Sequence, residues 1–321
     1  MIIESAAIVA GFILLIWSAD RFIIGAAATA RNLDVPPLII GLTIVGFGTS
    51  APEMMVAGFA SYDGSPAMAI GNALGSNITN ITLVLGVAAL IAPLNVESRI
   101  IKKELPILLL ATLLALALVR DFTLGRLDGF ILLSLLCLLM WWIARQGMRN
   151  QSSDALTDEF IEELPAEMPT SKAVFWLIAG LILLTASSKL LVWGAVNVAT
   201  ELGVSELIIG LTIIAIGTSL PELAASITGA LKNEHDIAIG NVVGSNLFNT
   251  LGVLAIPGLM KPSILQEDIL YRDFPIVLML TIMLFIMAYG FRGQGRINRI
   301  EGSILLCAFI GYQLLLFFTL D

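Results

Sequence analysis

The chain has 321 residues, of which 58% are hydrophobic and only 13% are charged, and its formal net charge is −8. Soluble domains carry about 25% charged residues, so this composition excludes an ordinary globular domain and predicts a polytopic membrane protein. The acidic balance argues against nucleic acid as a partner and against a basic, lipid-binding surface. Cys137 and Cys307 lie apart in apolar stretches, which favours core packing over a disulfide or a metal cluster.

A membrane-spanning helix needs about 20 consecutive, largely apolar residues. On this criterion we expect a first five-helix repeat at residues 1–145, an acidic linker at 146–172 and a second five-helix repeat at 173–321. The ten predicted spans lie near 4–29, 37–60, 67–92, 105–119, 126–145, 173–199, 207–230, 236–260, 273–290 and 299–319. The chain is therefore expected to be an all-α membrane protein.

The odd number of spans in each repeat decides their relative orientation. Five crossings place the start of the second repeat on the opposite side, so we expect two inverted repeats, an arrangement typical of secondary transporters. Loops on the N-terminal side carry four Lys or Arg residues, and loops on the other side carry eleven. Because positive residues favour the cytoplasmic side, we expect both termini outside and the linker in the cytoplasm. The expected setting is the plasma membrane, which is the inner membrane of a bacterium.

A polar motif occurs once in each repeat, and its two copies are 169 residues apart. The segment 41–53 ends in Gly-Thr-Ser-Ala-Pro-Glu, and the segment 210–222 ends in Gly-Thr-Ser-Leu-Pro-Glu. A second motif, Gly-Ser-Asn-x-x-Asn, lies at 75–80 and at 244–249. Polar groups inside a membrane must be satisfied by protein, water or ions, so the two copies predict one site built from two halves.

The prolines of the motif predict a helix break at the midplane in each repeat. Pro52 and Pro221 have no N–H to donate and crowd the carbonyl group four residues earlier, so carbonyl oxygens become free there. Carboxylate, carbonyl, hydroxyl and amide oxygens are the ligands that hard cations prefer, and two carboxylates balance one divalent charge, which favours calcium. The carboxylates and hydroxyls beside the breaks belong to Glu53, Thr49 and Ser50, and to Glu222, Thr218 and Ser219.

Both motifs, placed in two inverted halves, resemble the calcium/cation antiporter superfamily, whose best-known members are the sodium/calcium exchangers. The short central loop is similar to that of the bacterial inner-membrane members. The resemblance implies that Glu53 and Glu222 are the principal carboxylate ligands for calcium and sodium, which compete for one central site. It further implies carbonyl ligands at Gly46, Thr49, Ala215 and Thr218, hydroxyl ligands at Ser50, Ser76, Ser219 and Ser245, and a place for Asn80 in the middle of the cluster.

Asn249 is a departure from this family, whose well-studied members carry Asp at that position. We include Asn249 among the candidate ligands, as the counterpart of Asn80. A third acid in the cluster would tend to stay protonated through like-charge repulsion, and Asn is a neutral near-isostere of protonated Asp. We therefore hypothesise that exchange survives this replacement.

The function that we expect is secondary active antiport of calcium for sodium, by alternating access at a midplane site. The transported ions are calcium and sodium, and no resident cofactor is expected. The expected partners are inorganic cations and the lipid bilayer, with no obligate protein partner. Proton- or potassium-coupled exchange on the same scaffold stays open as an alternative, and a cation channel is a further one. An enzyme is not expected, because the sequence offers no set of nucleophile and base.

Overall fold

The computed structural model describes residues 2–33, 46–96, 99–149, 168–232, 235–289 and 295–319, and these ranges are mainly helical. The first half contains α1 (Ile2–Asn32), α3 (Gly46–Thr49), α4 (Ala51–Tyr62), α5 (Pro66–Thr79), η2 (Asn80–Val84), α6 (Leu85–Ile91), α7 (Arg99–Leu118), η3 (Val119–Asp121) and α8 (Arg126–Arg149). The second half contains α10 (Thr170–Leu202), α11 (Glu206–Ile209), η4 (Gly210–Ile214), α12 (Ala215–Thr218), α13 (Leu220–Lys232), α14 (His235–Phe248), η5 (Asn249–Val253), α15 (Ala255–Met260), η6 (Ile269–Asp273), α16 (Phe274–Tyr289) and α17 (Arg299–Phe318). The first five residues of the repeated motif, 41–45, and most of the predicted acidic linker, 150–167, lie outside the described residues.

Seven of the described helices are long and apolar enough to cross a membrane, and the bent pair at 206–218 and 220–232 makes an eighth if it is one span. The two other predicted spans miss this criterion for simple reasons. The span predicted at 37–60 begins outside the described residues. α7 begins six residues earlier than predicted, and its first turns carry Lys102, Lys103 and Glu104. The helix thus continues through a charged segment that a hydropathy criterion leaves out.

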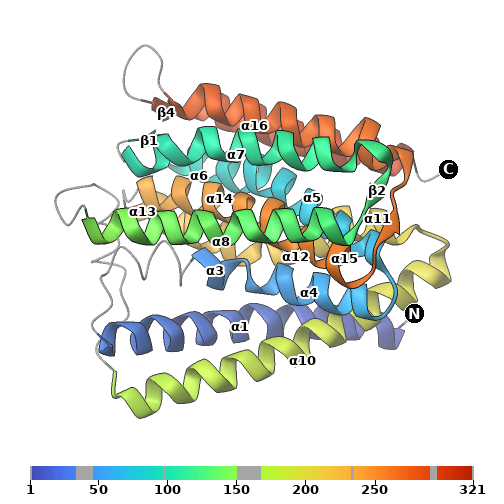
Figure 1. The fold of residues 1–321 in the computed structure, drawn as a ribbon, viewed down its shortest axis with the longest axis horizontal. Coiled ribbons are helices and arrows are strands. Elements are labelled where there is room, and N and C mark those ends of the chain that lie inside the picture. The colour runs from blue at the N-terminus through green and yellow to red at the C-terminus, as the bar shows by residue number, and fades with distance from the viewer. Residues whose placement is uncertain are drawn as a thin grey trace.

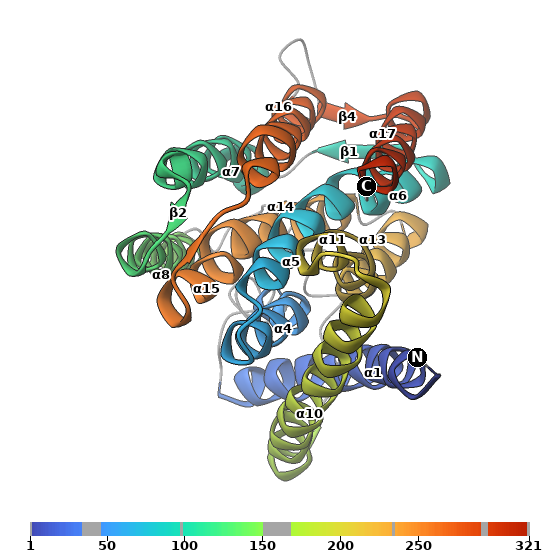
Figure 2. The ribbon, with the colours of Figure 1, turned by 90° about the vertical axis from the view of Figure 1, so that its right-hand side faces the viewer.

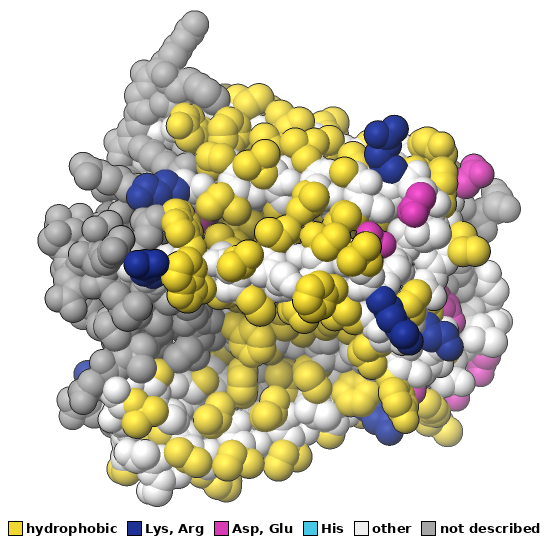
Figure 3. Space-filling view, viewed as in Figure 1, with side chains coloured by type: hydrophobic (Ala, Val, Ile, Leu, Met, Phe, Trp, Pro, Cys, Tyr) yellow, Lys and Arg dark blue, Asp and Glu magenta, His cyan; other side chains and the backbone are white. Residues whose placement is uncertain are grey.

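The surface of the molecule is apolar around its middle and charged toward its ends. In Figure 3, hydrophobic side chains cover most of the length of the helices, while Lys, Arg, Asp and Glu side chains gather toward the left and right ends. Ile13 on α1, Phe130 on α8 and Ile310 on α17 are among the large apolar side chains that point outward. Such a surface suits the hydrocarbon core of a bilayer, with the charged ends at its interfaces.

The two long helices α1 and α10 pack against each other through reciprocal contacts. A Cβ atom added at Gly11 would lie 3.1 Å from the Cα atom of Leu191, and one added at Gly180 would lie 2.7 Å from the Cα atom of Phe22. Gly180 is the counterpart of Gly11 in the repeat, and Leu191 is the counterpart of Phe22. Each half therefore makes the same contact with the other, as a two-fold relation requires.

Two pairs of counterparts lie on this pseudo-two-fold axis. The Oγ atoms of Ser18 and Ser187 are 3.5 Å apart, and these residues are separated by 169 positions. The Nδ2 atom of Asn246 donates to the carbonyl oxygen of Asn77 at 3.4 Å, again across 169 positions. A two-fold relation between halves with an odd number of spans makes the halves inverted in the membrane. The predicted fold class, two inverted five-helix repeats, is confirmed.

Two short strand pairs join the halves at opposite ends of the molecule (Figure 1). β1 (Leu94–Val96) pairs antiparallel with β4 (Gly295–Ile297), and β2 (Thr123–Leu124) pairs antiparallel with β3 (Ser263–Ile264). β1 and β3 follow the third span of their own halves, whereas β2 and β4 precede the last span. Each pair therefore joins the strand after the third span of one half to the strand before the last span of the other half, as a two-fold axis between the halves requires.

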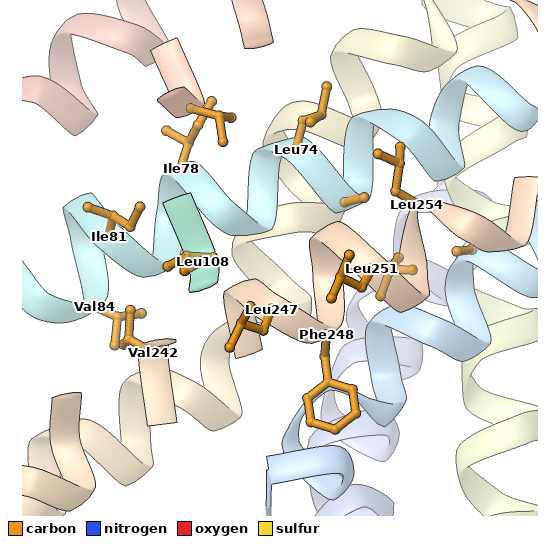
Figure 4. Close-up of a cluster of buried hydrophobic side chains, with 14 of the residues drawn as sticks. Leu74, Ile78, Ile81, Val84, Leu108, Val242, Leu247, Phe248, Leu251 and Leu254 are labelled. Carbon is orange, nitrogen blue, oxygen red and sulfur yellow. The ribbon is translucent and has the colours of Figure 1, made fainter. Parts of the chain in front are cut away.

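The two central spans, α5–η2–α6 and α14–η5–α15, pack close to neighbouring backbone. Cβ atoms added at Gly71 and Gly75 would lie 2.5 Å and 2.8 Å from carbonyl oxygens of the segment 207–211, so these glycines permit close helix approach. α1 and α10 form a separate layer on α3, α4 and α12 (Figures 1 and 2). Figure 4 shows the apolar packing around the central spans, with labels on Leu74, Ile78, Ile81, Val84, Leu108, Val242, Leu247, Phe248, Leu251 and Leu254.

Candidate functional site

Each copy of the first motif interrupts its helix at a serine that lies two residues before the proline. Ser50 lies between α3 and α4, and Ser219 lies between α12 and α13, with nearly identical φ and ψ of −84° and about 0°. The helix axis bends by 41° at Ser219. Pro52 and Pro221 follow two residues later and have no N–H for the preceding turn. The predicted helix interruptions are confirmed at both prolines.

The structure buries the predicted ligands at the centre of the molecule. Both glutamates are fully buried, and no predicted hydroxyl or amide side chain is more than 3% exposed. Gly46 begins α3, and its counterpart Ala215 begins α12 and is also fully buried. The fully or nearly fully buried polar members are Thr49, Ser50, Glu53, Ser76, Asn80, Thr218, Ser219, Glu222, Ser245 and Asn249.

Hydroxyl groups join the two halves inside this cluster. The Thr49 and Ser245 hydroxyl oxygens are 3.4 Å apart, and the Ser76 and Thr218 hydroxyl oxygens are also 3.4 Å apart. Each contact joins a threonine of the first motif to a serine of the second motif in the opposite half. Ser245 also donates to the Oε1 atom of Glu222 at 3.2 Å. Residues far apart in the sequence thus come together in the fold.

Several oxygens of the cluster have no hydrogen-bond donor. Among the described residues, no partner reaches either carboxylate oxygen of Glu53, Oε2 of Glu222 or the hydroxyls of Ser50 and Ser219. The same holds for Oδ1 of Asn80 and for both side-chain polar atoms of Asn249. Buried polar atoms in native proteins are nearly always paired, so a concentration of unpaired oxygens points to ligands for cations.

The negative charge of the two glutamates is also not balanced by basic side chains among the described residues. The Glu53 and Glu222 carboxylates are close enough to repel each other. Within the described part of the chain, neither forms an ion pair with Lys or Arg. An uncompensated buried carboxylate costs several kcal/mol, and a bound cation removes that cost. No group of three or more His, Cys, Asp or Glu side chains that could hold a metal occurs in the described ranges, so neutral oxygens must complete any coordination shell.

Asn80 and Asn249 each open a π-helical turn, η2 and η5. The backbone N–H groups of Leu85 and Leu254 donate to the carbonyl oxygens of Asn80 and Asn249, five residues back. Such wide turns often mark functional sites, because they redirect side chains and loosen the regular hydrogen-bond pattern. Nothing in the local sequence pattern indicated these turns.

Two asparagines outside the predicted ligand set, Asn72 and Asn241, contact the site. Asn72 donates from Nδ2 to the Glu53 carbonyl oxygen at 3.2 Å, and Asn241 donates to the Glu222 carbonyl oxygen at 3.2 Å. Asn72 lies four residues before Ser76, so both side chains face the same way on α5. That spacing was the available signal for this role.

The whole chain is similar to known membrane transport proteins. It matches the sequence model described as "Sodium/calcium exchanger protein" over residues 4–145 and 172–318. It is 49% identical over 321 residues to the protein named "Putative antiporter CaxA" from Alkalimonas amylolytica, covering 99% of both chains. It is 40% identical to "Inner membrane protein YrbG" from Escherichia coli K12, covering 99% of this chain and 98% of that protein.

A solved structure of the sodium-calcium exchanger NCX_Mj has the same fold. It superposes with a TM-score of 0.67 at 31% sequence identity and covers 96% of this chain and 97% of its own. Family match, sequence identity and superposition all extend over both halves. The chain therefore belongs to the sodium/calcium exchanger family.

Proposed function

We propose that this protein is a secondary active antiporter that exchanges calcium for sodium by alternating access at a midplane site. The observation that carries the proposal is the buried pair Glu53 and Glu222, which has no basic partner among the described residues and is surrounded by unpaired neutral oxygens. One calcium ion, or sodium ions in its place, would neutralise the pair. The substrate cations are the cargo, and no resident cofactor is required.

The proposed ligands follow the two breaks and the two central spans. Glu53 and Glu222 supply the carboxylates, and the breaks supply the carbonyl oxygens of Gly46, Thr49, Ala215 and Thr218. The hydroxyls come from Ser50, Ser76, Ser219 and Ser245, and Asn80 and Asn249 supply amide oxygens. All of these are hard oxygen ligands, which suit calcium and sodium better than softer metals.

The negative charge of Glu53 and Glu222 also explains why transport of one cation would require return transport of another. Without a cation, the two carboxylates would have to cross an apolar constriction as a net charge of about −2, at a cost of several kcal/mol for each uncompensated ion. A loaded site crosses as a neutral or nearly neutral unit. The empty carrier is thereby held on one side, and flux of one ion depends on return flux of the other.

The layer of α1 and α10 is the proposed moving part. Phe12 of α1 covers Gly217 so closely that a Cβ atom there would overlap the ring, and Ile23 of α1 covers Gly48 in the same way. One helix thus lies over the ligand-bearing segments of both halves. Sliding of this layer would uncover the site to one side at a time.

We further propose two repeats at 1–145 and 173–321, joined by a linker at 146–172 in the cytoplasm, with both termini outside. The excess of Lys and Arg in loops on the linker side supports this orientation. The similarity to a protein named for the inner membrane of Escherichia coli supports a bacterial inner membrane as the setting.

Flux in proteoliposomes tests the function. Vesicles loaded with sodium and diluted into sodium-free buffer with calcium should take up calcium, and uptake should stop when the sodium gradient is removed. Parallel vesicles with only a pH gradient, or only a potassium gradient, separate the rival counter-ions. Calcium uptake that follows only a pH gradient would show proton exchange instead, and uptake without any counter-ion would show a channel.

A further inference from the structure

Asn72 on α5 and Asn241 on α14 make matching contacts in the two halves. The Nδ2 atom of each lies 3.2 Å from the backbone carbonyl oxygen of the glutamate in its own half, Glu53 or Glu222. A carbonyl oxygen can only accept, so this contact fixes the NH₂ group on that side of the amide. The amide oxygen must then point the other way.

The amide oxygens point at threonines of the opposite half. Thr218 donates to Oδ1 of Asn72 at 3.2 Å, and Thr49 donates to Oδ1 of Asn241 at 3.4 Å. Each asparagine thus joins the glutamate segment of its own half to the threonine at the break of the other half. The two threonines, Thr49 and Thr218, are the last residues of α3 and α12.

The Thr218 hydroxyl has one proton and several acceptors. Besides Asn72, it lies 3.0 Å from the carbonyl oxygen of Ile214, 3.4 Å from that of Ala215 and 3.4 Å from the Ser76 hydroxyl oxygen, which can donate to it. If the proton is donated to the helix carbonyls, those oxygens lose a lone pair that a cation could use. If the proton is donated to Asn72, the Ala215 carbonyl stays free to face a cation.

We propose that Asn72 and Asn241 are positioning residues that draw the threonine protons across the interface between the halves. This keeps the hydroxyl lone pairs and the neighbouring carbonyl oxygens directed at the cation. The proposal rests on cation exchange at the Glu53–Glu222 site. It adds an amide contact between the halves at each threonine, beside the serine–threonine contacts within the ligand set.

Other buried amides on the same helices do not have this geometry. Asn77 donates to the Thr250 hydroxyl at 2.9 Å, and Asn246 donates to the Asn77 carbonyl oxygen. None of these contacts reaches a glutamate or a threonine at a break. Asn77 therefore serves as a matched control, because its loss also removes a buried hydrogen bond between α5 and the second half.

A double-mutant cycle on calcium affinity tests the proposal. Asn72→Leu keeps the approximate size and removes both polar atoms, and Thr218→Val keeps the shape and removes the hydroxyl. Each should raise the calcium KM of sodium-driven uptake about tenfold, with a maximal rate within about threefold of wild type. The double variant Asn72→Leu/Thr218→Val should raise the calcium KM by less than the product of the two single effects, because both single variants remove the Asn72–Thr218 hydrogen bond.

The control pair lies within one half. Asn72→Leu combined with Thr49→Val should multiply the two single effects, because Thr49 donates to Asn241 instead. Asn77→Leu should lower the melting temperature but leave the calcium KM near wild type. Asn72→Ala replaces Asn72→Leu if the larger side chain prevents folding, as judged by size-exclusion chromatography.

The outcomes separate this inference from the proposed function. Multiplicative effects in both pairs, in a protein that exchanges sodium for calcium, would overturn the positioning role and leave exchange intact. A KM shift in Asn77→Leu equal to that in Asn72→Leu would also overturn it. A wild-type protein that shows no sodium-driven calcium uptake would contradict the proposed function itself.

Discussion

The two halves of the site carry matching residues, yet their glutamates have different neighbours. Glu222 accepts a hydrogen bond from Ser245 at 3.2 Å. Within the described residues, neither carboxylate oxygen of Glu53 has a hydrogen-bond partner. Both serines make the same contact with the threonine of the opposite half, Ser76 with Thr218 and Ser245 with Thr49, each at 3.4 Å. The difference between the halves is therefore the serine–glutamate hydrogen bond, which is formed at Glu222 and not at Glu53.

This difference shows how an inverted repeat can serve alternating access. A strictly two-fold symmetric carrier would present the same path to both sides at once. Inverted halves with interchangeable sequences can exchange conformations, and this exchange moves the opening from one side to the other. Since the serines and glutamates of the two halves are identical, we expect the Ser245–Glu222 hydrogen bond to open and its counterpart between Ser76 and Glu53 to form in the opposite-facing state.

One element of asymmetry belongs to the sequence itself. Asn241 also donates to the Ser226 hydroxyl at 3.3 Å, and Ser226 in turn donates to the Ala238 carbonyl oxygen at 3.2 Å. Ala57 is the counterpart of Ser226 in the first half and has no hydroxyl. The second glutamate segment is therefore tied to α14 by an additional hydrogen bond that the first half lacks.

The largest expected effect comes from removing either glutamate charge. Glu53→Gln and Glu222→Gln should each reduce sodium-driven calcium uptake by about 100-fold or more, because a divalent cation would face a single carboxylate in a buried site. Initial rates in proteoliposomes measure this. Glu267→Gln, at an exposed position outside the site, should transport like wild type. Near wild-type uptake in either site variant would remove that glutamate from the ligand set and break the equivalence of the halves.

A smaller effect should distinguish the two central asparagines. Asn80 donates to Oδ1 of Asn246 at 3.2 Å, whereas Asn249 has no side-chain partner among the described residues. Asn80→Asp places oxygen against oxygen and should raise the calcium KM about tenfold. Asn249→Asp should stay within about threefold at neutral pH, because repulsion from the glutamates keeps the new acid protonated.

A pH series sharpens this second test. In Asn249→Asp, calcium affinity should rise at alkaline pH, where the new acid loses its proton and adds a third negative charge. The wild-type protein, measured alongside, should lack that step. A sharp gain in calcium affinity already at neutral pH would contradict the view of position 249 as a neutral ligand.

The smallest expected effect concerns the extra hydrogen bond of the second half. Ser226→Ala should change the calcium KM by about fivefold at most, since one neutral hydrogen bond is lost. Ala57→Ser in that background tests whether the tie can be moved to the first half, and Ser303→Ala on exposed α17 serves as the control. An effect of Ser226→Ala as large as that of Glu222→Gln would mean that this tie, rather than conformation, decides the asymmetry.

Much of the site could be predicted from local pattern because proline, glutamate and small hydroxyl residues act locally. Pro52 and Pro221 interrupt their helices wherever they lie, and a buried carboxylate needs a counter-charge in any fold. For Asn72 and Asn241, local pattern indicates only that each lies on the same helix face as a site serine, Ser76 or Ser245, and not which groups it binds. An asparagine in an apolar helix is equally suited to joining helices, and only its neighbours in space show what it holds.

The membrane setting, the two inverted repeats, the helix interruptions and the oxygen-rich chemistry of the site could all be predicted from the amino-acid sequence. These follow from composition, the parity of spans and the backbone chemistry of proline, none of which requires distant contacts. The threonine–serine pairs, the positions of the π-helical turns and the contacts of Asn72 and Asn241 with the opposite half became visible only in the folded molecule. These features depend on how α5 and α14 pack against the opposite breaks, and such packing places together residues that are about 140 to 200 positions apart.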